Sequence, residues 1–228
     1  MIVDAHARVG DCYFLKKNYN SAITYYQKVI GFRYAFGDYS YYQMGEAYYR
    51  LRKYKSSVSN FGKLVSGFRK SAFRDNALDR MADIYGNWLK DNNNSYKYAK
   101  QLVTEYPRSP LASISYNRMA IASYNLGRKA DAVKYYKKVL SDYGGDKENA
   151  QLALDNLKSL VTAAEFDKIL KDYRKSNPNM NENLADLVLN TGKERYFAGN
   201  YSSAVSQFST YIKDYKNEIG RASCRERV

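Results

Sequence analysis

The chain has 228 residues, of which 45% are hydrophobic and 15% aromatic, and only three are proline. This composition indicates a folded, largely helical protein, while the absence of any run near the roughly 20 apolar residues of a membrane span predicts no transmembrane segment. The net charge of +14 is spread along the chain, which favours a solvated basic surface over a concentrated binding tail. The two cysteines lie far apart in the sequence and form no disulfide framework.

A pattern of small and aromatic residues appears between residues 10 and 30 and then recurs. In its first copy Gly10 and Ala22 are the small residues and Tyr26 is the aromatic one. Small residues let two helices approach closely, and a single helix pair cannot bury its apolar face alone. The pattern therefore predicts helix pairs that stack on one another. Three further copies keep the separation of 12 positions between the small residues: Gly45 and Ser57, Ala120 and Ala132, and Gly192 and Ala204.

This skeleton resembles the tetratricopeptide repeat, which has a period of about 34 residues. The resemblance covers nearly the whole chain. It implies an all-α fold, an α-solenoid winding as a right-handed superhelix of about six helix pairs, four well matched and two degenerate. We expect the pairs at about residues 2–30, 38–66, 72–106, 109–143, 146–175 and 180–215.

The turns between paired helices are predicted from local breaks in the pattern. They fall at Lys17-Asn18 in the first pair, at Arg52-Lys53 in the second and at residues 127–128 in the fourth. In the third pair we take Ala82 and Ala99 as the small residues, which are 17 positions apart, so residues 87–94 are expected to hold an extended turn. The fifth pair keeps helical periodicity but loses the signature residues.

The last eleven residues, 218–228, depart abruptly from the repeat pattern. They resemble the translation of a short-read sequencing adapter, so we expect them to be non-native and the solenoid to occupy residues 1–217. We further expect the gene to continue differently beyond Asn217.

Residues 105–112 and 208–215 resemble a subset of the family, the bacterial cell-envelope repeat proteins. This subset includes the tol-pal-associated periplasmic coordinator and the tetratricopeptide lipoprotein of the outer-membrane β-barrel assembly machine. Its members are adaptors that hold other proteins together. The resemblance suggests the periplasm or cell envelope, although no signal peptide or lipidation signal occurs in this chain.

Residues suited to catalysis are sparse. His6 is the single histidine, and a lone histidine in a first helix is more often a surface or packing residue. Cys12 has no evident basic partner, so a packed thiol is the favoured interpretation. No cluster has metal-ligand spacing, and no glycine pattern indicates a phosphate loop or a dinucleotide site. We therefore expect no enzyme activity, no cofactor and no metal.

In this family, first-helix side chains one and four to five positions after the signature small residue line an inner groove that holds a partner's peptide segment. Carried over to this sequence, the resemblance predicts a groove lined by Asp11, Phe14, Leu15, Glu46, Tyr49, Arg50, Asp83, Asn87, Ile121, Tyr124, Asn125, Lys193, Tyr196 and Phe197. An acidic residue begins each set in the first three units. Such a groove suits an extended segment that carries Lys, Arg or backbone donors. Alternatively, these carboxylates only balance nearby lysines on exposed helix faces.

The favoured function is a non-catalytic protein-protein interaction scaffold that binds a partner segment in the groove. One alternative is a basic module that binds nucleic acid or an anionic envelope polymer through its Lys/Arg-rich face. A third is a stretch without a ligand of its own that continues a longer array.

Overall fold

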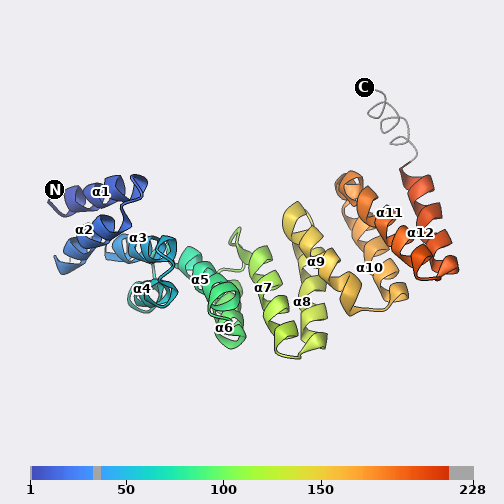
Figure 1. Ribbon diagram of the computed structural model, residues 1–228, viewed down its shortest axis with the longest axis horizontal. Helices are drawn as coiled ribbons and strands as arrows, with labels where there is room; N and C mark the ends of the chain where they lie inside the picture. Colours follow the sequence, from blue (N-terminus) through green and yellow to red (C-terminus); the bar gives the residue numbers. More distant parts are fainter. Residues whose placement is uncertain (1, 33–36, 216–228) are drawn as a thin grey trace, which may run out of the picture. The chain divides into compact units, whose positions relative to one another are not determined.

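The computed structural model describes residues 2–32 and 37–215, with side chains for all of these except 180–183; the expected non-native tail, 218–228, lies outside this range. Every regular element in the described ranges is a helix (Figure 1). The elements are α1 (Ile2–Leu15), α2 (Tyr19–Gly31), α3 (Gly37–Arg50), α4 (Tyr54–Gly67), α5 (Arg74–Asp83), η1 (Ile84–Trp88), α6 (Asn92–Glu105), α7 (Ala112–Asn125), α8 (Lys129–Asp142), α9 (Lys147–Leu160), α10 (Ala163–Ser176), η2 (Pro178–Met180), α11 (Asn181–Phe197) and α12 (Tyr201–Asp214). The all-α class of stacked helix pairs is confirmed.

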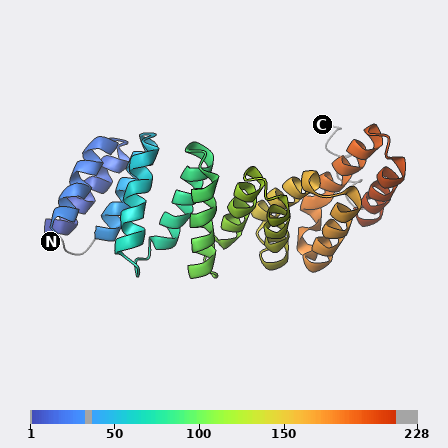
Figure 2. The same ribbon diagram turned by 90° about the horizontal axis from the view of Figure 1, so that it is seen from below.

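The chain forms two compact units, residues 1–139 and 140–228. In the first unit, successive pairs from α1 to α7 lie side by side in chain order (Figure 2). In the second unit, α11 and α12 form the last antiparallel pair and pack closely together. Among the described residues, no helix is both long and apolar enough to cross a membrane.

Three of the four well-matched pairs close with an aromatic ring lying directly against a glycine, and the pair at about residues 109–143 has Ala120 at that position. A Cβ atom added to Gly45 would lie 2.5 Å from a ring carbon of Phe61, and one added to Gly10 would lie 2.6 Å from a ring carbon of Tyr26. Both rings are fully buried. The signature small residues are therefore required by the close approach of the paired helices.

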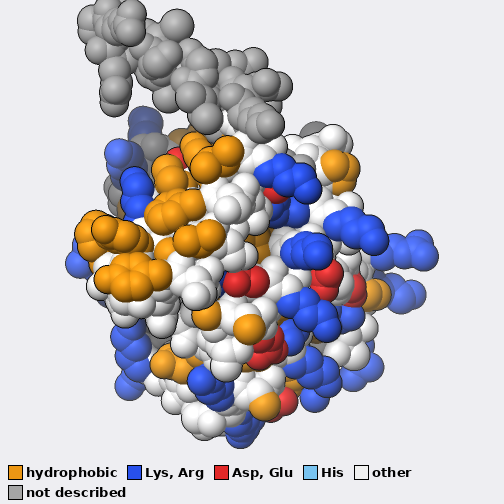
Figure 3. Space-filling view, turned by 90° about the vertical axis from the view of Figure 1, so that its right-hand side faces the viewer, with side chains coloured by type: hydrophobic (Ala, Val, Ile, Leu, Met, Phe, Trp, Pro, Cys, Tyr) orange, Lys and Arg blue, Asp and Glu red, His pale blue; other side chains and the backbone are white. Residues whose placement is uncertain are grey.

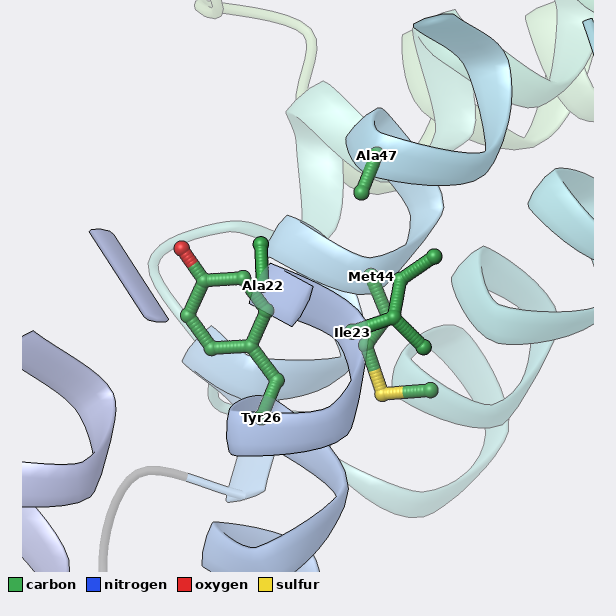
Figure 4. Packing of buried hydrophobic residues seen from close by; sticks show 5 residues of the cluster. All are labelled: Ala22, Ile23, Tyr26, Met44 and Ala47. Atoms are coloured by element: carbon green, nitrogen blue, oxygen red, sulfur yellow. The ribbon is translucent and has the colours of Figure 1, made fainter. Parts of the chain in front are cut away.

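A second kind of contact joins one pair to the next. Ala22, Ile23 and Tyr26 of α2 form a buried cluster with Met44 and Ala47 of α3 (Figure 4). Burying apolar area of this kind is the main source of stability in such a stack, because each pair alone is too small to form a core.

The predicted turns are confirmed at three places. Lys17 and Arg52 adopt left-handed backbone angles, with φ of 60° and 57°, and Gly127 has φ of 75° in the corresponding turn of the fourth pair. Asn18 then caps α2 by accepting a hydrogen bond from the backbone N–H of Ser21.

The third pair differs from its prediction. The first helix continues beyond α5 through the π-helical turn η1, and α6 begins at Asn92, so the extended turn expected at residues 87–94 is wrong. The Ser95 hydroxyl donates to the Ala82 carbonyl at 2.8 Å, as the Ser57 hydroxyl donates to the Gly45 carbonyl at 2.7 Å. Ser95, and not Ala99, is thus the second small residue. Its separation from Ala82 is 13 positions because the π-turn accommodates one extra residue.

Candidate partner-binding surface

The acidic residues predicted to line the groove are already engaged by arginines within the stack. Glu46 of α3 accepts two hydrogen bonds from Arg80 of α5, at 2.6 Å from Nε and 2.9 Å from Nη2. The Arg80 guanidinium also lies over the ring of Tyr49, 4.3 Å from its centroid. This paired and stacked arginine bridges the second and third helix pairs.

The same arrangement recurs one pair further along. Arg118 of α7 donates to Asp79 at 3.0 Å and to Asp83 at 2.7 Å, both on α5. Burial raises the pKa of the Asp79 carboxyl above its ordinary value, and the charge of Arg118 opposes part of that rise. Asp83 also accepts from the Asn87 side-chain amide at 2.7 Å. These groups form a shared polar network on the first-helix side of the stack.

Asp11 is used within the first two pairs. Its Oδ1 accepts hydrogen bonds from the hydroxyls of Tyr26 at 2.8 Å and Tyr39 at 2.5 Å, while its Oδ2 accepts from Arg8. Burial, together with the hydrogen bond to Asp11, raises the pKa of Tyr39 to about 12. Asp11 thus links α1, α2 and α3.

Four predicted residues meet in a single cavity of about 170 Å³. Asp83 and Asn87 line it from α5 and η1, and Ile121 and Asn125 line it from α7. Other lining residues include Lys90, Asn92, Ser95 and Arg118. Asn125 donates its side-chain amide to the side-chain oxygen of Asn92 at 3.1 Å. We call this cavity and the exposed Tyr124 beside Asn125 on the same helix the α5–α7 surface.

The remaining predicted residues of the first unit differ in their exposure and do not line the cavity. Phe14 packs edge-on against Tyr19, whereas Leu15 is 81% exposed. Tyr49 is half-buried and contacts Trp88 edge-on, with their ring centroids 6.2 Å apart, and Arg50 is exposed beside it. Their role in binding stays a prediction.

The predicted residues of the second unit, Lys193, Tyr196 and Phe197, are all exposed on α11. None of them lines a groove of that unit that has a volume of about 820 Å³. That groove is lined mainly from α9 and α11, and includes Leu152, Asp155, Lys158, Leu187 and Glu194. Sequence reasoning missed it because the fifth pair carries no signature residues from which positions could be carried over.

Arg80 and Arg118 were also missed, although the sequence carries a signal for them. Each lies two positions before a signature small residue, Ala82 or Ala120, and Arg8 stands in the same relation to Gly10. The arginine is therefore part of the repeat pattern in three copies. Its carboxylate partners in the second and third pairs lie 34 to 39 residues away, about one repeat period.

No group of three or more His, Cys, Asp or Glu side chains that could hold a metal ion occurs in the part of the chain that the structure describes. His6 is hydrogen-bonded to the carbonyl of Ile2 and lies edge-on to Phe32. Cys12 is exposed, contrary to its interpretation as a packed thiol.

Solved structures share this fold at low sequence identity. The chain is similar to MamA, with a TM-score of 0.61 and 15% identity over 79% of this chain and 94% of that one. It is similar to PilW, described as a widely conserved type IV pilus biogenesis factor, with a TM-score of 0.57 and 15% identity over 95% and 94%. A putative kinesin light chain from Podosopora anserina gives a TM-score of 0.58 and 12% identity over 79% and 96%. These likenesses establish the fold alone.

No curated protein matches the chain in sequence. Models of the tetratricopeptide repeat match residues 3–35, 39–71, 76–109 and 114–143, which together make up more than half of the chain. Repeats of this family generally mediate protein–protein interaction, and neither the family matches nor the structural neighbours support the nucleic-acid alternative. The chain belongs to the tetratricopeptide repeat family.

Proposed function

We propose that this protein is a non-catalytic adaptor that binds an extended segment of a partner protein on the α5–α7 surface. The observation that carries the proposal is the convergence of four residues that the family register predicts, Asp83, Asn87, Ile121 and Asn125, on one cavity between successive first helices.

The chemistry of this surface favours recognition of a peptide backbone together with an apolar side chain. The side-chain amides of Asn87, Asn92 and Asn125 each offer donors and an acceptor, which matches the alternating N–H and C=O groups of an extended chain. Ile121 and Tyr124 are exposed and supply apolar contact area. Recognition through lysines or arginines of the partner contributes less, because Glu46 and Asp83 already pair with Arg80 and Arg118.

The stack also supports binding through preorganisation. The hydrogen-bonded arginines hold α3, α5 and α7 in register before a partner arrives. The partner segment is then the main component that loses conformational freedom on binding, which lowers the entropic cost of association.

A pull-down with the full chain tests the proposal. We compare the wild type with a variant carrying Asn87→Ala and Asn125→Ala, washing each at low and then at high salt. The expected result is a protein that the wild type retains at high salt and that the double variant loses. Asn93→Ala is the matched control, because Asn93 is exposed in the first turn of α6 and does not line the cavity.

Two results would count against this function. Equal retention by the wild type and the double variant would move the site elsewhere. Nucleic acid or an anionic polymer that is released by salt would favour the basic-face alternative, because counterion release makes phosphate binding steeply salt-dependent.

The cellular setting of this adaptor is proposed to be the bacterial cell envelope. The resemblance of residues 105–112 and 208–215 to envelope adaptors supports this setting, as does the structural likeness to PilW. Fractionation of cells that carry the tagged gene at its own locus tests it, and recovery only in the cytosolic fraction would contradict it.

A further inference from the structure

A groove of about 610 Å³ lies between the second helices of the second and third pairs, α4 and α6, which both pack on α5. Much of its lining is apolar. Val58 of α4 and Met81 of α5 form a buried floor, and the half-buried Leu89 follows η1. Tyr85 and Tyr98 stack with their ring centroids 5.5 Å apart and extend this lining onto α6. We call this feature the α4–α6 groove.

Gly62 keeps the groove clear of a side chain in the middle of α4. A Cβ atom added there would meet a single atom within 4 Å, the Cε of Met81 at 3.8 Å, which is an ordinary van der Waals distance. Glycine weakens a helix interior, and no close ring requires it here as one does at Gly45. Three other second helices have a long side chain at this ninth position, namely Gln27, Lys100 and Lys137.

Lysines flank the groove on both sides. Lys55 lines it from α4, and the Nζ of Lys97 on α6 lies 5.1 Å from the centroid of the Tyr98 ring. Both lysines are exposed, and neither has an ion-pair partner among the residues that the structure describes. The apolar lining therefore lies between two cations whose charges the fold does not neutralise.

The carboxylates near the groove are already in use. α4 contains no acidic residue, and Glu105, the only one in α6, pairs with Arg74. Asp91 lines the groove, but it caps α6 by accepting a hydrogen bond from the backbone N–H of Asn94 at 3.0 Å. On the face of the molecule in Figure 3, by contrast, Lys and Arg side chains lie among Asp and Glu side chains.

We propose that the α4–α6 groove binds an amphipathic helix of a partner protein, with its apolar face on the floor and Asp or Glu on its flanks. An apolar lining between two lysines is complementary to an apolar stripe between two acidic edges. The apolar floor favours such a helix over a nucleic acid, whose phosphates would use the lysines alone. This site involves neither Asn87 nor Asn125, so it stands or falls separately from binding at the α5–α7 surface.

Fluorescence anisotropy of a dye-labelled synthetic peptide, titrated with the full chain, tests the proposal. The probe is an amphipathic helix with Leu on one face and Glu on the other. The wild type should bind it, and should not bind a scrambled peptide of the same composition or a peptide with Lys in place of Glu. Gly62→Gln should raise the dissociation constant roughly tenfold or more, because the added side chain would fill the groove. Lys55→Glu combined with Lys97→Glu should exchange the preference between the Glu and Lys peptides.

The controls separate loss of the groove from loss of the fold. Gln has a higher helix propensity than Gly, so Gly62→Gln should keep the wild-type helicity and should not melt earlier. Gly67→Gln, at an exposed position of α4 outside the groove, should bind the peptide like the wild type. Equal binding of the scrambled peptide, full affinity in Gly62→Gln, or binding of a single-stranded oligonucleotide in place of the Glu peptide would each overturn the proposal.

Discussion

In the first two pairs the second helix contacts the next pair through apolar side chains, whereas in the fifth pair it does so through ion pairs. In α2 and α4 the fifth and twelfth residues of the helix, which we call the stacking positions, are Ile and Val side chains that pack against the next pair. In α10 the same two positions are Asp167 and Arg174. Asp167 accepts from Arg195 of α11 at 2.8 and 2.9 Å and from Gln207 of α12 at 2.5 Å.

A second ion pair lies at the other position, where Arg174 donates to Asp214 of α12 at 2.5 Å. An apolar contact tolerates imperfect geometry, whereas a buried ion pair stabilises only while both partners are present. The fifth pair, which lacks the signature residues, is thus joined to the last pair through ion pairs.

The largest expected effect comes from placing a charge in an apolar contact. Ala22→Arg should destabilise the first pair by about 4 kcal/mol, because a buried, unpaired guanidinium cannot be accommodated against Tyr26 and Met44. Circular dichroism during urea unfolding measures it. Gln27→Arg, on the exposed side of α2, should change stability little, and an equally mild effect at Ala22 would refute the assigned register.

Removing one partner of the ionic contact comes next. Asp167→Asn should cost about 2 to 3 kcal/mol, because the Arg195 side chain, which is 9% exposed, loses its compensating charge. Urea unfolding again measures the loss. A double substitution of Asp167 and Arg195 to Asn and Met should recover part of it, and no recovery would indicate that the pair is not coupled.

The close approach within a pair gives a third test. Gly45→Ala should cost about 2 kcal/mol, because the added Cβ would overlap the Phe61 ring. In a double-mutant cycle, Phe61→Leu should relieve part of this cost by shortening the side chain. Strictly additive losses would show that the glycine is not required by the ring.

The buried carboxyl of Asp79 predicts a smaller, pH-dependent effect. Its folded-state pKa is raised by burial, so the folded protein holds this proton more tightly than the unfolded chain does. The unfolding free energy of the wild type minus that of Asp79→Asn should therefore increase as pH falls from 7 towards 4, through the raised pKa. A difference that decreases over this range would contradict the sign.

The smallest effect is expected at the turns. Arg52→Gly should stabilise the second pair by about 0.5 to 1 kcal/mol, because glycine adopts the left-handed angle without a Cβ clash. Gly127→Arg, at the equivalent turn of the fourth pair, should have the opposite sign. Thermal melts of both variants check the prediction, and shifts in the same direction would contradict it.

The sequence predicted the helix pairs and three turns because small residues, rings and turn residues act locally. The prediction took Ala99 in place of Ser95 as the second small residue of the third pair. A π-turn changes the spacing by one residue without leaving a break in helical periodicity. It also missed Arg80 and Arg118, whose partners lie about one repeat away. The family register places Asn87 and Asn125 on the same cavity. That Glu46 and Asp83 already pair with arginines could not be predicted, because it depends on side-chain geometry.

The most direct test of the adaptor function is amide hydrogen exchange on the full chain, with and without the protein recovered in the pull-down. Binding at the α5–α7 surface should slow exchange around η1 and along α7, and leave α2 and α4 unchanged. Protection confined to the second helices, with none around η1 or α7, would contradict the proposed site.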